Sequence, residues 1–104
     1  MNAVLYRYVS DAERQHIEQS KMIRSHSGKT YFSPDLYDAA ADARQRLALS
    51  VAPAWRVGPI PADEMPDFDA VSLQAASPKY GQPGGGLECA TRHIVYLFGF
   101  SRLK

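Results

Sequence analysis

Three residues stand out because their chemistry differs from that of their neighbours: Arg7, Ser33 and Glu88. Arg7 lies in an apolar, strand-like stretch, where a guanidinium is costly to bury unless an anion such as phosphate meets its fork of donors. Ser33 precedes Pro34 at a predicted helix start, where free amides favour an anionic or carboxamide ligand. Glu88 follows Gly84–Gly86, which let a backbone approach a ligand closely, and a carboxylate placed there can act in catalysis.

Each of these residues also has a purely structural explanation. Arg7 can lie on an edge strand with its charge in solvent. Ser33 can serve only as a helix cap, which is an ordinary use of serine. Glu88 can be an exposed residue after a glycine-rich turn. The residue types alone leave both interpretations open.

The elements that must position these residues follow from hydrophobic pattern and turn chemistry. Strands are predicted over residues 3–9, 30–33, 54–60, 71–73 and 94–100, with the last strand at the centre of the sheet. Helices are predicted over 10–20, with Ser10 and Glu13 as a reciprocal capping box, and over 33–49. An interruption is expected at Gly58-Pro59. This order predicts an α+β domain with a compact mixed or split sheet and two N-terminal helices, formed by residues 1–104 as one unit.

Composition narrows the class of protein. Twelve basic and eleven acidic residues give a net charge of +1, which predicts no strong attraction to nucleic acid or to an anionic membrane. The single cysteine, Cys89, excludes an internal disulfide, and its neighbour Glu88 disfavours a reactive thiolate. No metal site is expected from one cysteine and scattered histidines. No apolar run approaches the ~20 residues of a membrane span, so we expect a cytoplasmic protein without a membrane partner.

Three segments together resemble a known family. They are Leu5-Tyr-Arg-Tyr-Val-Ser10 followed by Glu13, Gly28-Lys-Thr-Tyr-Phe-Ser-Pro34, and Gly84-Gly-Gly-Leu-Glu88. Their order resembles that of small bacterial ADP-ribosyltransferase-fold toxin domains of the Arg-Ser-Glu type. Such domains form the C-terminal tips of polymorphic toxins, including Rhs and contact-dependent inhibition proteins. The resemblance implies an ADP-ribosyltransferase-like fold, NAD as substrate, a macromolecular acceptor, a cognate immunity protein and delivery into a target cell's cytosol as part of a larger secreted protein.

The resemblance also implies a role for each residue. Arg7 would bind the NAD phosphates, and Ser33 with Phe32 would line the nicotinamide pocket. Glu88 would bond the ribose 2′-hydroxyl and stabilise the positive charge that develops as nicotinamide leaves, which suits a fixed carboxylate. Stacking on the nicotinamide would come from Tyr6, Tyr8 or Tyr31.

Gly86 departs from the pattern of that family. Many transferases carry a Glu or Gln two residues before the catalytic Glu, where it engages the acceptor. Transfer to arginine side chains is therefore not expected, and a different acceptor or plain NAD hydrolysis remains open. Gln82, earlier in the same loop, is a candidate replacement.

Two other functions remain open from the sequence. One is a metal-independent ribonuclease toxin, in which acid–base chemistry would come from His26, Lys29, Arg92 and His93. The other is a non-enzymatic interaction protein, such as an immunity partner or an adaptor.

Overall fold

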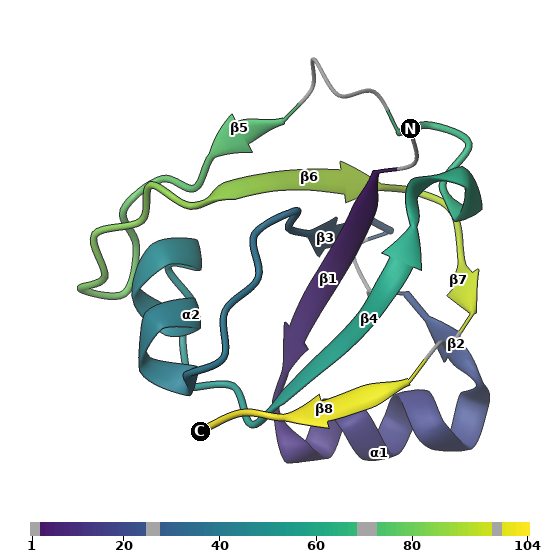
Figure 1. Cartoon of the computed structure of the whole chain (residues 1–104), viewed down its shortest axis with the longest axis horizontal. Helices are drawn as coiled ribbons and strands as arrows, with labels where there is room; N and C mark the ends of the chain where they lie inside the picture. Colours follow the sequence, from purple (N-terminus) through teal and green to yellow (C-terminus); the bar gives the residue numbers. More distant parts are fainter. Residues whose placement is uncertain (1–2, 25–27, 69–72, 97–98) are drawn as a thin grey trace.

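The computed structural model describes residues 3–24, 28–68, 73–96 and 99–104, and in these ranges the chain is a compact α+β unit (Figure 1). Its Cα radius of gyration is 12.6 Å. The described residues form two α-helices, both in the first half of the chain, and several short antiparallel sheets. The α+β class and the early placement of the helices were predicted correctly.

The first sheet has three antiparallel strands in the order β1-β4-β8. Its strands are β1 (Val4–Val9), β4 (Trp55–Pro61) and β8 (Phe100–Arg102). Side chains alternate across a strand, so Leu5 and Val9 of β1 enter one hydrophobic cluster whereas Tyr8 enters another. β1 therefore contributes side chains to two parts of the interior.

Two further sheets complete the β structure. The second three-stranded sheet has the order β3-β6-β5, formed by β3 (Thr30–Phe32), β6 (Leu87–Thr91) and β5 (Gln74–Ala75). A two-stranded ribbon joins β2 (Met22–Ile23) to β7 (Val95–Tyr96). An isolated bridge links the two larger sheets, because the Tyr6 amide donates to the Ser33 carbonyl at 2.7 Å and the Ser33 amide donates to the Tyr6 carbonyl at 2.8 Å. The sheet is thus split, with β1 and β3 as neighbours at the split.

Helix α1 (Asp11–Ser20) begins where the sequence predicts. The Ser10 hydroxyl accepts from the Glu13 amide at 3.2 Å, so serine capping is confirmed. The reciprocal half of the capping box was wrong. The Glu13 carboxylate accepts from Nε of Arg7 at 2.7 Å instead of reaching back to Ser10, since an ion pair gives a stronger hydrogen bond than a neutral amide does.

Helix α2 (Ala40–Leu47) is much shorter than the predicted helix over 33–49. The segment from Ser33 to Ala39 is held in irregular conformation by hydrogen bonds to distant residues. The Tyr8 hydroxyl donates to the Asp35 carbonyl at 2.7 Å and accepts from the Tyr37 amide at 2.8 Å. These bonds satisfy backbone groups that a helix would otherwise use, so Ser33 caps no helix.

The strand predictions near the C-terminus need correction. Residues 94–100 do not form one central strand, because within the described ranges Val95–Tyr96 pairs with β2 alone and Phe100 begins β8 at an outer position of a different sheet. Between them, Gly99 has a φ of +131°, which breaks regular pairing. Residues 97–98 of this prediction lie outside the described residues. So do residues 71–72 of the predicted strand over 71–73, and β5 begins at Gln74.

β4 continues through Gly58-Pro59, where an interruption was expected. The register passes from the Leu5–Ile60 pair to the Arg7–Val57 pair, so β4 carries one extra residue there as a bulge. A Cβ at Gly58 would lie 2.8 Å from the Leu5 carbonyl oxygen, which explains the glycine. A short 3-10 helix, Ala62–Glu64, directly follows β4.

Candidate functional site

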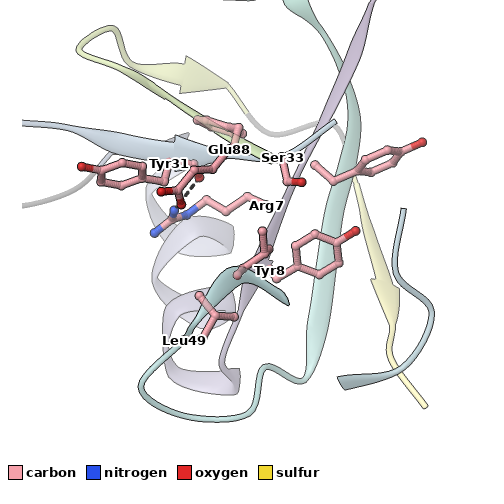
Figure 2. Close-up of a pocket in the computed structure, with 9 residues that line it drawn as sticks. Arg7, Tyr8, Tyr31, Ser33, Leu49 and Glu88 are labelled. Atoms are coloured by element: carbon pink, nitrogen blue, oxygen red, sulfur yellow. Dashed lines mark hydrogen bonds between the residues drawn. The ribbon is translucent and has the colours of Figure 1, made fainter. Parts of the chain in front are cut away.

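A small pocket opens where the two three-stranded sheets meet, and we call it the Arg7 pocket (Figure 2). Its lining residues are Tyr6, Arg7, Tyr8, Tyr31, Phe32, Ser33, Leu47, Leu49 and Glu88. All of the residues predicted for catalysis and for NAD binding are among them. The two leucines were not predicted, since an apolar residue near the end of a helix carries no signal of a site.

The strand pairing explains why residues so distant in sequence meet. The Tyr6–Ser33 bridge places Arg7 of β1 next to the end of β3. On the other side, β3 pairs with β6 up to the Phe32–Cys89 pair. Ser33 comes directly after Phe32 and Glu88 directly before Cys89, so the antiparallel pairing places both at the same end of that pair. Figure 2 shows the side chains of Arg7, Tyr31 and Glu88 projecting toward the same side of the pocket.

Arg7 is held from two sides. Its Nε donates to the Glu13 carboxylate at 2.7 Å, and its Nη1 donates to the Tyr31 carbonyl at 2.9 Å. β1 is an outer strand of its sheet, as the structural interpretation expected, but the Arg7 side chain is only 18% exposed and its charge is not in open solvent. Within the part of the chain that the structure describes, Nη2 has no hydrogen-bond partner. The guanidinium is therefore fixed in direction and keeps donor capacity for an anion.

Ser33 is buried, with 1% of its surface exposed. Its hydroxyl accepts from the Asp35 amide at 3.0 Å, which makes a local serine turn in place of the predicted helix cap. Both backbone groups of Ser33 are used in the bridge to Tyr6. The residue thus anchors β1 to β3, and its hydroxyl proton is still available to a group in the pocket.

Glu88 is half-buried at the middle strand of its sheet. Burial raises the pKa of its carboxyl above the ordinary value of 4.5, and the positive charge of Lys79 partly opposes this effect. Among the described residues, the carboxylate has no hydrogen bond or ion pair with another side chain. A carboxylate that is partly desolvated and not neutralised can interact strongly with a positive charge that develops in the pocket.

The aromatic residues of the pocket differ in what they can offer. Tyr31 is 45% exposed, so its ring is free to cover a ligand. Tyr8 is buried, its hydroxyl is already bonded twice, and desolvation raises its pKa to about 12. Phe32 belongs to the main hydrophobic cluster and lines the pocket from the side of the core. Tyr31 is therefore the best placed of these residues to stack on a nicotinamide ring.

The free volume of the Arg7 pocket is about 50 Å³. Typical small-molecule pockets measure about 300 Å³ or more, so a ring can enter only if side chains at the rim move apart. Tyr31 is exposed and Leu49 is partly exposed. Movement of these two lining side chains is the simplest way to widen the opening of the pocket.

A larger residue at position 86 would clash with its neighbours in this structure. A Cβ there would lie 2.5 Å from the Tyr37 hydroxyl oxygen and 2.9 Å from the Arg46 carbonyl oxygen. The position two residues before Glu88 is thus sterically closed to the Glu or Gln that many transferases carry. Gln82 does not replace it, because Gln82 exchanges backbone hydrogen bonds with Lys79 in a turn and does not line the pocket.

The residues of the predicted ribonuclease site are only partly described. His26 lies outside the described residues. Arg92 and His93 are exposed, and both follow the end of β6. Their amides are held by side chains: that of Arg92 donates to the Asp67 carboxylate at 2.9 Å, and that of His93 donates to the Thr91 hydroxyl at 3.1 Å. Neither lines the Arg7 pocket.

In the four described ranges, no group of three His, Cys, Asp or Glu side chains is arranged to hold a metal ion. Over the same ranges, neither helix has the length and apolar character needed to cross a bilayer. Comparisons of this chain with family models, with curated proteins and with solved structures found no match.

Proposed function

We propose that this chain is an NAD-consuming domain, either a mono-ADP-ribosyltransferase or an NAD glycohydrolase, with the Arg7 pocket as its active site. One observation carries the proposal: Arg7, Ser33 and Glu88 come from three separate segments and line one pocket. Arg7 comes from β1, Ser33 directly follows β3 and Glu88 comes from β6, so the fold brings a cation, a hydroxyl and a carboxylate to one place.

The chemistry follows from the charges in the pocket. The bond between ribose C1′ and the nicotinamide nitrogen breaks, nicotinamide leaves with the electron pair, and positive charge develops on the ribose. The carboxylate of Glu88 stabilises that charge, and the guanidinium of Arg7 binds the phosphates. Water then attacks C1′ and loses a proton, giving ADP-ribose, or an acceptor nucleophile takes the place of water.

The closed position at Gly86 supports hydrolysis over transfer to arginine side chains. A transferase for that acceptor needs a group beside the catalytic carboxylate, and a side chain at residue 86 would clash with Tyr37 and Arg46. Water needs no such group. Transfer to an acceptor that carries its own reactive nucleophile remains within the proposal. The resemblance to polymorphic toxins extends it to action in a target cell's cytosol, with an immunity protein that blocks the pocket.

The test is nicotinamide release from NAD by the purified chain, measured by chromatography. The variant Glu88→Gln keeps the shape of the side chain and removes its charge, so release should fall about 100-fold or more. Glu64→Gln is the matched control, because Glu64 is exposed at the 3-10 helix and does not line the pocket. Its activity should equal that of the unmodified chain.

Two further arms separate the alternatives. Adding bacterial lysate and labelled NAD separates hydrolysis from transfer, because only transfer places the label on a macromolecule. Incubation with RNA tests the ribonuclease alternative, which predicts cleavage that survives Glu88→Gln and is lost in His93→Ala. The proposal fails if the folded chain releases no nicotinamide with or without lysate, or if Glu88→Gln releases it at the normal rate.

A further inference from the structure

A second and larger hollow adjoins the Arg7 pocket, and we call it the arginine groove. Its free volume is about 1140 Å³. Its lining residues are Arg7, Ser10, Ala12, Glu13, His16, Arg24, Gly28, Thr30, Arg92 and Ile94. Arg7 is common to the lining of the groove and of the pocket, so a single ligand can occupy both and pass beside the same guanidinium.

The charge of the groove is positive. Among the described residues that line it, Glu13 is the one acidic residue, and this carboxylate is paired with Arg7 at 2.7 Å. Arg24 and Arg92 remain, and both are exposed. Across the described residues, neither guanidinium takes part in an ion pair or a side-chain hydrogen bond. Two guanidinium groups with all their donors available favour an anion with several oxygens, such as phosphate.

The size and net charge of the molecule limit the kind of anion. A groove of about 1140 Å³ is slightly larger than typical small-molecule pockets of about 300–1,000 Å³, so it has room for a ligand the size of a nucleotide. A polynucleotide would need a positive surface that extends well beyond one such ligand, whereas the whole chain has a net charge of +1. A short diphosphate ligand fits these facts better than a nucleic acid does.

We infer that the arginine groove binds the diphosphate of a nucleoside diphosphate through Arg24 and Arg92, which act there together with Arg7, the residue that the two hollows share. Where the ligand is NAD, which rests on the proposed function, the adenosine diphosphate half lies in the groove and the nicotinamide ribose lies in the Arg7 pocket. The small size of the pocket agrees with this division, since only one end of a dinucleotide enters it. Arg24 and Arg92 are then binding residues that contact the cofactor far from the reacting bond.

The test uses ADP as the probe, with the full chain and isothermal titration calorimetry. The variants Arg24→Gln and Arg92→Gln should each weaken ADP binding by about 10-fold, because each removes charge-assisted hydrogen bonds to phosphate. Arg102→Gln is the matched control: it makes the same change of charge at an exposed residue of β8 that lines neither hollow. Its ADP affinity should stay within about 2-fold of that of the unmodified chain.

The outcomes separate this inference from the proposed function. If ADP binds, the two arginine variants weaken it, and NAD is not consumed, the groove is assigned correctly and the proposed function fails. If NAD is consumed but ADP affinity is the same in the Arg24, Arg92 and Arg102 variants, or if no ADP binding is detected, the inference is overturned. It is also overturned if a short RNA displaces ADP and binds more tightly than ADP does. Circular dichroism and thermal melting establish that each variant is folded.

Discussion

The steric closure at Gly86 gives a sharp prediction about stability. In Gly86→Ala, the added Cβ would lie 2.5 Å from the Tyr37 hydroxyl oxygen and 2.9 Å from the Arg46 carbonyl oxygen. The backbone cannot easily shift away, because the Gly86 amide donates to the Arg46 carbonyl at 2.8 Å and the Gly86 carbonyl accepts from the Ala76 amide at 2.7 Å. Inserting one methyl group into such a tight site costs about 1–3 kcal/mol of folding free energy.

The assay is urea unfolding followed by tyrosine and tryptophan fluorescence, with thermal melting as a second measure. A loss of about 1–3 kcal/mol corresponds to a melting temperature lowered by roughly 4–8 °C per kcal/mol in a domain near this size. The denaturant dependence of the free energy should not change, since the amount of surface exposed on unfolding is the same.

A second variant tests the cause of the loss. Tyr37→Phe removes the hydroxyl oxygen that the new Cβ would meet first, and a double-mutant cycle cancels the lost hydrogen bond between Tyr37 and Asp35. Gly86→Ala should therefore cost at least about 0.5 kcal/mol less in the Tyr37→Phe background. The steric argument is refuted if Gly86→Ala leaves the free energy of unfolding unchanged, or if its cost is the same in both backgrounds.

Two other predictions concern titrating groups. The positive charge of Lys79 lowers the pKa of Glu88, so Lys79→Gln should raise the pKa of Glu88 further. In the proposed mechanism Glu88 acts in its ionised form, so on acidification the variant should lose NAD turnover at a higher pH than the unmodified chain does. Turnover at pH 8 and the pH profile of a Lys21→Gln control should stay unchanged. An acid limb that does not move contradicts this placement of Lys79. Burial raises the pKa of the Cys89 thiol to about 11, so a thiol reagent at pH 8 should label Cys89 only as the chain unfolds. Rapid labelling of the native chain would contradict the burial of this thiol.

The ion pair between Arg7 and Glu13 explains how one residue serves structure and site together. A half-buried guanidinium without a partner would be costly, and Glu13 removes most of that cost. The pair also fixes the direction of Arg7, so that its remaining donor is available where the Arg7 pocket and the arginine groove meet. The structural and functional interpretations of Arg7 are therefore compatible.

Local chemistry allowed part of this structure to be predicted from the sequence. Ser10 begins α1 because its hydroxyl caps an amide three residues later, and that interaction lies within one turn. The β-branched and aromatic residues around Arg7 predicted β1. The candidate residues of the site were found because their charge or polarity contrasts with their neighbours, a contrast that is visible in the sequence.

The tertiary structure decided what depends on distant partners. The hydroxyl of Tyr8 holds the segment around Asp35 and Tyr37, so α2 begins at Ala40 and not at Ser33. The outer position of β8 depends on which strand pairs with β4, and strand order leaves no mark in a local pattern. Likewise, the sequence by itself identified Arg7, Ser33 and Glu88, but their meeting in one pocket depends on the Tyr6–Ser33 bridge. That bridge joins backbone groups 27 residues apart, which every residue type except proline can supply.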